Sequence, residues 1–225
     1  VPRVRGRVRG MKGTFSGGTL ASFRTTMAAA AKDRDLVNVL RNPFSLTPSF
    51  TGADQPLGNK PEFDKVLQSW VAPFVMASIN TKNIHRSNML MDHQYGTNFV
   101  YDEMMVTGPG EKGEAIAHHI ANDTSMADDP RQPGEGPDKD ERESGMYDVL
   151  FVGEAKDGQL VKVSVQGDRD PGYGSTSKMI AESAVCLLKN PEAASGGIWT
   201  PAPAMGSLLI ERLQKNAGLT FIIEN

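Results

Sequence analysis

The sequence predicts an α+β fold in which helices pack on a mixed, largely antiparallel sheet. Segments with strand-like alternation occur at both ends of the chain, over residues 1–10 and 219–224. Two more strand segments, 147–155 and 159–167, flank a hairpin turn at Lys156-Asp157-Gly158. Segments with helical periodicity separate these strands, which is typical of an α+β domain.

The composition is that of an ordinary soluble protein. The 225 residues suffice for one large or two small domains, and 39% of them are hydrophobic, with a net charge of -3. This balance predicts no nucleic-acid partner, and no apolar run approaches the roughly 18 residues of a membrane span. The single cysteine, Cys186, excludes an internal disulfide and favours a reducing, cytoplasmic location. Because the chain opens on Val1 within a strand pattern, we expect a fragment of a longer protein.

The first ten residues alternate with period two. Their arginines lie on one face of the expected strand, and valines and glycines lie on the other: Arg3, Arg5, Arg7 and Arg9 against Val4, Gly6, Val8 and Gly10. One interpretation is a solvated edge strand, because charges discourage edge-to-edge pairing. The other is a cationic stripe that meets an anionic cofactor or an acidic neighbouring domain.

The next elements follow from helical spacing and from breakers. A helix is expected over 20–42, where Asn42-Pro43 ends it, and a polar linker over 45–60. Pro61 is expected to open a second helix, because Phe63, Val66, Leu67 and Trp70 have i, i+3, i+4, i+7 spacing. The patterns then predict a strand or buried connection over 71–79, a helix over 83–91, a strand over 98–108 and a helix over 114–123.

Residues 122–146 interrupt this order. They contain eight acidic residues, three prolines and three glycines, which predicts an exposed excursion rather than core. After the hairpin, the segment 170–190 reads as a turn that runs into a helix. A helix over 207–216, a cap at Gly218 and a last strand over 219–224 complete the chain.

The stretch GTFSGGTLAS, residues 13–22, joins the first strand to the first helix. Gly13 and Gly18 have P-loop spacing, but Thr19 stands where a phosphate-binding lysine is required, so nucleotide hydrolysis is unsupported. Ser16 or Thr19 can cap the helix, and glycines permit close backbone approach. A capped turn and an anion-attracting helix N-terminus both remain open from local chemistry.

A literal G-x-G-x-x-G occurs at 108–113, between a strand and a helix. Pro109 removes an N–H from this loop and Glu111 places a negative charge beside it. The helix that follows leads into the acidic excursion rather than into a second parallel strand. The loop is therefore expected to be a surface turn.

Other constellations give no catalytic centre. His118 and His119 are adjacent and thus about 100° apart on a helix, and His85 and His93 lack metal-ligand spacing, so no metal is expected. Cys186 lies on the apolar stripe of its helix and reads as a core thiol. No G-x-S-x-G elbow is present.

Several segments, taken in order, resemble one family, the saccharopine dehydrogenase-like oxidoreductases, including the branch called trans-acting enoyl reductases. The segments that carry the resemblance are GTFSGGTLAS (13–22), HRSNML (85–90), NFVYDE (98–103), PGEGPDKDERESGMY (133–147), GDRDPGYGSTSKMIAESAVCL (167–187) and GGIWTPAPAMGSLLIERLQKNAGLTF (196–221). They cover nearly the whole chain. The glycine-tyrosine turn followed by Gly-Gly-x-x-Thr-Pro and a terminal amphipathic helix is the most specific combination.

The resemblance implies the C-terminal, substrate-binding portion of an NAD(P)-dependent oxidoreductase, which could be an enoyl reductase. The N-terminal Rossmann domain that binds NAD(P) is missing, so no cofactor-binding residue is expected in this chain. Residues 1–194 would form a substrate and dimerisation domain, and 195–225 would pack on the missing domain. A homodimer and a small-molecule, acyl or lipid substrate are implied. The alternative is a non-catalytic scaffold or a lipid-associated module with the same fold.

The resemblance also marks candidate substrate-binding residues. They are Ser16, Gly17, Gly18, Thr19, Arg86, Ser87, Asn88, Asp170, Gly172, Tyr173 and Gly174. The glycine loop is expected to border the cleft where substrate meets cofactor. Tyr173 could donate a hydrogen bond or proton to a substrate, or could be a packed structural tyrosine. No residue is assigned as the catalytic acid or base.

Overall fold

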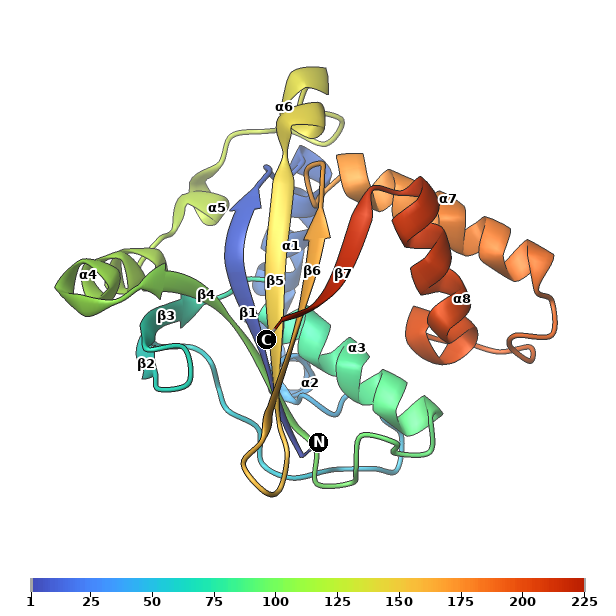
Figure 1. Cartoon of the computed structure of the whole chain (residues 1–225). Helices are drawn as coiled ribbons and strands as arrows, with labels where there is room; N and C mark the ends of the chain where they lie inside the picture. The colour runs from blue at the N-terminus through green and yellow to red at the C-terminus, as the bar shows by residue number, and fades with distance from the viewer. Residues whose placement is uncertain (1, 225) are drawn as a thin grey trace.

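The first strand of the chain lies in the middle of a large sheet (Figure 1). A computed structural model describes residues 2–224, and these form a seven-stranded sheet in the order β2-β3-β4-β1-β5-β6-β7. The strands are β1 (Arg3–Lys12), β2 (Glu62–Asp64), β3 (Ser69–Pro73), β4 (Val100–Gly108), β5 (Met146–Glu154), β6 (Leu160–Gly167) and β7 (Leu219–Glu224). β1 and β4 are parallel and every other pair is antiparallel, which confirms the predicted fold class.

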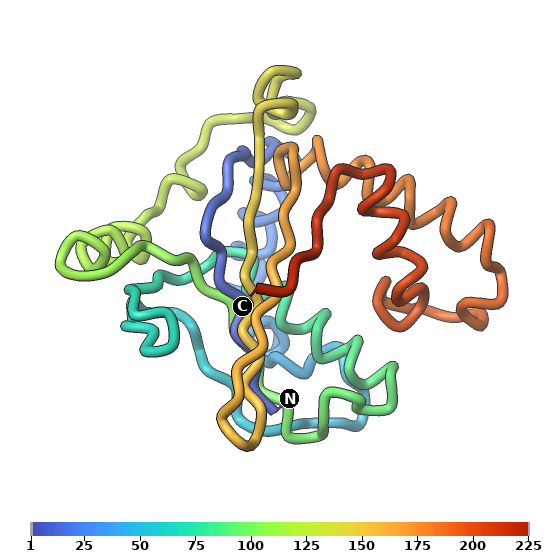
Figure 2. Tube along the Cα trace, in the orientation of Figure 1, coloured from blue at the N-terminus to red at the C-terminus, as the bar shows by residue number. Residues whose placement is uncertain are grey.

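Helices cover the back of this sheet and its two sides. They are α1 (Gly17–Ala30), α2 (Arg34–Arg41), α3 (Ala77–Leu90), α4 (Gly110–Ala121), α5 (Ser125–Asp128), α6 (Lys139–Ser144), α7 (Gly174–Lys189) and α8 (Pro201–Asn216). α1, α2 and α3 lie behind the central strands, α4 lies beside β3 and β4, and α7 and α8 lie beside β7, as the tube in Figure 2 also shows. The front of β5 carries no helix in this view.

An apolar cluster joins the last helices to the sheet. Leu209 and Leu213 of α8 and its C-cap Ala217 pack with Cys186 of α7 and Leu219 of β7. Cys186 is fully buried, so the prediction of a core thiol is confirmed. Within the described residues no helix is long and apolar enough to cross a membrane.

The prediction of a helix after Pro61 is wrong, because this segment forms the hairpin of β2 and β3. Phe63 and Trp70 face each other across the hairpin, with ring centroids 6.0 Å apart. The Asp64 carboxylate accepts hydrogen bonds from the N–H groups of Val66 and Leu67 and closes the turn. A spacing of seven residues brings two aromatic rings together in this hairpin as well as on a helix, so periodicity alone was misleading.

The helix expected over 20–42 is two helices. α1 ends at Ala30, and Asp33 caps α2 by accepting hydrogen bonds from the N–H groups of Asp35 and Leu36. The Asp33 side chain begins a second helix where composition alone predicts continuation of the first.

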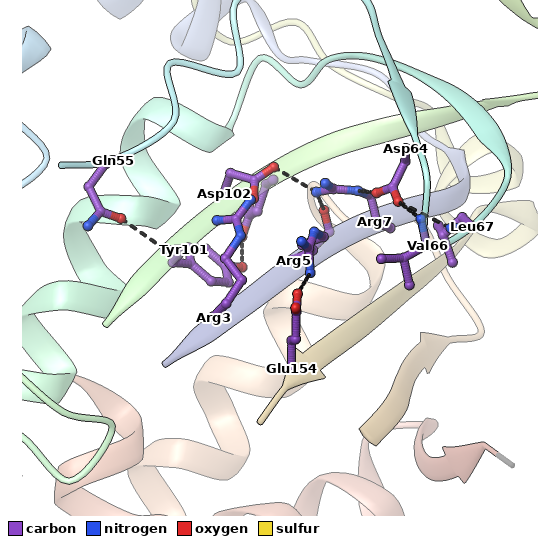
Figure 3. Close-up of polar contacts among 12 residues, drawn as sticks. Arg3, Arg5, Arg7, Gln55, Asp64, Val66, Leu67, Tyr101, Asp102 and Glu154 are labelled. Carbon is purple, nitrogen blue, oxygen red and sulfur yellow. Dashed lines mark hydrogen bonds and ion pairs between the residues drawn. The ribbon is translucent and has the colours of Figure 1, made fainter. Parts of the chain in front are cut away.

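The edge-strand interpretation of β1 is also wrong. β1 is central, and its arginines pair with carboxylates on neighbouring strands and on β2. Arg5 donates to Glu154 at 2.8 Å, and Arg9 contacts both Asp148 and Glu224. The alternation itself is correct, but the charges are neutralised within the sheet (Figure 3).

β4 to β7 match expectation, whereas α3 begins at Ala77, inside the segment 71–79 predicted as a strand or buried connection, and α4 begins at Gly110 rather than at residue 114. β5 and β6 form the predicted hairpin, in which Gly158 has a φ of +83°. The helix predicted to follow the turn at residue 170 is α7, and β7 is the predicted last strand. α8 begins earlier than expected, at Pro201, and contains a non-helical residue at Gly206.

Candidate functional site

The N-terminus of α1 lies at the upper end of the sheet in Figure 1, directly after β1. Ser16 has extended backbone angles and is the N-cap: its Oγ accepts a hydrogen bond from the N–H of Thr19 at 3.2 Å. The two hydroxyl oxygens, Ser16 Oγ and Thr19 Oγ1, are 3.3 Å apart. The structure therefore confirms that Ser16 caps this helix.

Tyr173 brings the second predicted segment to the same place. Its phenolic hydroxyl donates a hydrogen bond to Ser16 Oγ across 157 positions of sequence. The side chain is 37% exposed, so it is neither buried in the core nor free in solvent. Ser16, Thr19 and Tyr173 thus form one group of hydroxyls at a helix N-terminus.

Asp170 shapes the turn that carries Tyr173. It is fully buried, and its carboxylate accepts hydrogen bonds from the N–H groups of Gly172 at 3.0 Å, Tyr173 at 3.1 Å and Gly174. A Cβ on Gly174 would lie 2.5 Å from the carbonyl oxygen of Arg142. These contacts fix the position of Tyr173 and leave Asp170 no exposed atom.

The acidic excursion covers part of the glycine loop. Gly17 donates its N–H to the carbonyl of Glu135 at 2.9 Å, and a Cβ on Gly17 would lie 1.8 Å from the carbonyl oxygen of Gln132. The close approach that Gly17 permits is therefore made by the chain's own backbone. A Cβ on Gly18 would meet only Ser16 Oγ, at 3.6 Å, so the open side of the loop lies there.

The third predicted segment lies elsewhere, near the end of α3. Arg86 donates to the carbonyls of Leu46 and Ile198, and the Ser87 hydroxyl lies 2.7 Å from Thr200 Oγ1. Asn88 binds the Gly96 carbonyl and the Tyr95 N–H. These contacts fasten α3 to the neighbouring loops and do not join the hydroxyl group at Ser16.

The cluster of hydroxyls formed by Ser16, Thr19 and Tyr173 can bind an oxygen atom that carries negative charge. The hydroxyls of Tyr173, Ser16 and Thr19 form a hydrogen-bonded chain at the positive end of the α1 dipole, and one O–H of the Ser16 and Thr19 pair stays free to donate to a carbonyl oxygen or an anion. Only Ser16, Thr19 and Tyr173 of the predicted residues present such hydrogen-bonding side chains at this position.

The loop at 108–113 does not fit a dinucleotide. Its glycines 108 and 110 have positive φ and lie in an exposed turn, as predicted. A Cβ on Gly113 would lie 2.0 Å from the Gly108 carbonyl oxygen, so the loop closes on its own helix. Glu111 occupies the first turn of α4, where it opposes an anion, and the next strand, β5, runs antiparallel to β1. Among residues 2–224, no group of three His, Cys, Asp or Glu side chains is placed to hold a metal ion.

Sequence reasoning missed a cavity beside β4, which we call the β4-edge pocket. It has a volume of about 600 Å³ and lies between residues 55–59, the end of α2 and the first turns of α3. Its charged lining residues are Arg41, Lys82, Asp102 and Glu103. The available signal was the pair Asp102-Glu103 inside an otherwise apolar strand pattern.

The chain is similar to mycobacterial proteins over most of its length. One protein of Mycobacterium tuberculosis (strain H37Rv), which carries the provisional name trans-acting enoyl reductase, is 33% identical over 92% of this chain and 56% of the relative. Trans-acting enoyl reductases of Mycobacterium bovis (strain BCG) and Mycobacterium ulcerans are 28% identical over 88% of this chain and 54% of each relative. The chain spans about half the length of these curated relatives. No family model and no solved structure matches it.

The chain is an α+β homologue of proteins named trans-acting enoyl reductases.

Proposed function

We propose that the chain is the substrate-binding part of an NAD(P)-dependent enoyl reductase of the saccharopine dehydrogenase-like type. The observation that carries this proposal is the 33% identity over 92% of the chain to a protein named as a trans-acting enoyl reductase. Because the loop at 108–113 does not fit a dinucleotide, we assign cofactor binding to the part of the relatives that this chain does not match. The whole reaction is thus a property of the longer protein.

The cluster of hydroxyls at the N-terminus of α1 is the proposed binding site for the thioester oxygen. When a hydride adds to the β-carbon of an enoyl thioester, negative charge moves through the conjugated bonds to that oxygen. The Tyr173 hydroxyl donates to Ser16 Oγ, and Ser16 and Thr19 share a second hydrogen bond, so one O–H of the Ser16 and Thr19 pair is left to donate to this oxygen at the positive end of the helix. Their positions are fixed before substrate arrives, because Asp170 holds the turn and Ser16 caps the helix.

The experiment measures NADPH and NADH oxidation by absorbance, using the protein at the full length of its relatives and a crotonyl thioester as substrate. We expect Tyr173→Phe to lower kcat/KM about tenfold or more, because Ser16 loses the hydrogen bond from Tyr173 that orients its hydroxyl toward the developing oxyanion. Tyr95→Phe is the matched control, since Tyr95 is also 37% exposed but lies in the turn that follows α3. Equal activity of both variants would show that Tyr173 does not take part in the site. If neither NADPH nor NADH is oxidised, the proposed enoyl reductase activity is wrong.

A second candidate function is a non-catalytic scaffold or lipid-associated module. Exposed apolar side chains favour it: Leu188 is 81% exposed, Ile198 is 86% exposed and Ile180 is 68% exposed. Sedimentation with vesicles of phosphatidylcholine and phosphatidylglycerol tests it. Binding that is lost in a Leu188→Ser, Ile198→Ser double variant, together with no reductase activity, would favour this function over the first.

The division at residue 195 is part of the same proposal. α8 and β7 pack on α7 and β6 of the same chain, and they also present Leu208, Ile210 and Ile223, which are 40%, 40% and 76% exposed. These side chains offer a surface for a nucleotide-binding domain. A homodimer is proposed from the family resemblance, and sedimentation equilibrium tests it.

A further inference from the structure

The β4-edge pocket exists because β4 lacks a strand partner along half of its edge. β3 pairs with β4 only from Met104 onward. Before that point the Gln55 side chain replaces a strand: its amide nitrogen donates to the Phe99 carbonyl at 3.1 Å, and its oxygen accepts from the Tyr101 N–H at 2.9 Å (Figure 3). A side chain satisfies the backbone there in place of a paired strand, and residues 55–59 line the cavity beside this edge of β4.

One side of the pocket is apolar. Leu40 of α2, Leu57 of the loop and Phe74 before α3 line it, together with Pro43 and Ala77. Leu57 is 85% exposed although it belongs to this lining. The volume of about 600 Å³ lies within the range of small-molecule sites.

Both carboxylates in the pocket already have partners. Asp102 is bonded to Arg3 and Arg7, which lie behind the pocket. Glu103 accepts from the Tyr101 hydroxyl and from Asn80 Nδ2 at 2.8 Å, and burial raises the pKa of its carboxyl group, which disfavours its negative charge. The charge of Asp102 is thus compensated by two arginines, and the negative charge of Glu103 is disfavoured by burial.

The two cations in the pocket, in contrast, have unused donors. Lys82 Nζ donates to the carbonyls of Leu40 at 2.8 Å and Ser78 at 2.6 Å, which leaves one of its three N–H bonds. Within the described residues, Arg41 makes no hydrogen bond or ion pair, so its guanidinium keeps all of its donors. Burial lowers the pKa of Lys82, because no carboxylate compensates its charge.

We propose that the β4-edge pocket binds an amphipathic anion, that is, a carboxylate or phosphate joined to an aliphatic chain. The anion would contact Lys82 and Arg41, and the chain would lie along Leu40, Leu57 and Phe74. This inference goes beyond the proposed reductase function and involves none of the hydroxyls of Ser16, Thr19 and Tyr173. A free fatty acid and an acyl chain on a phosphate-bearing carrier share this chemistry.

Isothermal titration calorimetry on the 225-residue chain tests the proposal with decanoate, decyl phosphate and decanol. We expect decanol to bind at least tenfold more weakly than either anion, because it lacks the charge that Lys82 and Arg41 recognise. The stronger of the two anions identifies the head group. Equal affinity for decanol and both anions, or no measurable binding of the anions, would overturn the proposal.

Three variants locate the site. Arg41→Gln and Lys82→Gln should each weaken decanoate binding about tenfold. Arg34→Gln, which removes the same charge at the other end of α2 and outside the pocket lining, should leave binding unchanged. Lys82 also holds the Leu40 carbonyl, so Arg41→Gln, at an exposed side chain, keeps the test valid if Lys82→Gln does not fold. If Arg34→Gln lowers the affinity for decanoate as much as Arg41→Gln does, the β4-edge pocket is not the binding site. Reduction of a crotonyl thioester by the full-length protein should not respond to Arg41→Gln, so the two proposals fail separately.

Discussion

Arg7 donates from Nε to the carboxylate of Asp64 at 2.7 Å, and both side chains are 2% exposed. A second bond, from Arg7 NH1 to Asp102 at 2.8 Å, holds the guanidinium between two carboxylates (Figure 3). Burial alone would raise the pKa of Asp64, but the hydrogen bond and charge of Arg7 outweigh it and hold that pKa below its ordinary value. The charged face of β1 is therefore a structural element of the sheet.

We predict that Arg7→Ala lowers the free energy of unfolding by about 3–5 kcal/mol, because it leaves two carboxylates buried without their partner. Urea denaturation followed by circular dichroism measures this loss. Arg9→Ala is the matched control: the Arg9 side chain is 30% exposed, and its loss should cost less than about 1 kcal/mol. Similar costs for the two variants would contradict the structural role assigned to Arg7.

His85 predicts a pH dependence of stability. It is 3% exposed and packed against Phe44, with ring centroids 4.5 Å apart, and burial lowers its pKa from 6.5 to about 4. Between these two values the unfolded chain binds a proton that the folded chain does not. The free energy of unfolding should therefore fall as the pH drops from about 6.5 to about 4, by up to about 3 kcal/mol.

The variant His85→Phe isolates this effect, since it keeps an aromatic ring beside Phe44 and cannot titrate. Carboxyl groups titrate alike in both proteins, so the difference between the two stability profiles reports His85 alone. That difference should change between pH 6.5 and 4 and be flat above pH 7.5. Parallel profiles over the whole range would show that His85 does not titrate as its burial requires.

The two central glycines of the α1 loop should differ sharply. Gly17→Ala places a methyl group 1.8 Å from the Gln132 carbonyl, so residues 132–136 must move away. We expect faster hydrogen exchange and proteolysis around Glu135 in this variant. Gly18→Ala meets no atom closer than 3.6 Å and adds helix propensity of about 1 kcal/mol, so it should leave this segment protected. Equal exchange in both variants would show that the excursion does not rest on Gly17.

Local patterns predicted most of the sheet. β5, β6 and β7 have alternating side chains and clear turn residues, and Gly158 marks their hairpin. The hairpin of β2 and β3 was not predictable, because it depends on an Asp64 carboxylate that both closes the turn and pairs with Arg7. The position of β1 was hidden for a similar reason, since its arginines find their partners between 57 and 215 residues later in the sequence.

The candidate site was predictable in part. The resemblance marked Ser16 and Tyr173, and the structure joins them. No local pattern indicated that Gly17 is covered by Gln132, or that Lys82 and Arg41 share a cavity with Glu103. Such relationships arise from tertiary packing between segments that are far apart in sequence.

The central position of β1 constrains how the chain folds. Arg3 pairs with Val100 on one side and with Glu154 on the other, so both neighbours of the first strand are made long after it. Closing such long loops costs entropy before any contact is gained, which slows folding in chains with non-local pairing. During synthesis the β5 side of β1 stays unpaired until residues 146–154 have been made. Chaperones that shield exposed strands would act in this interval.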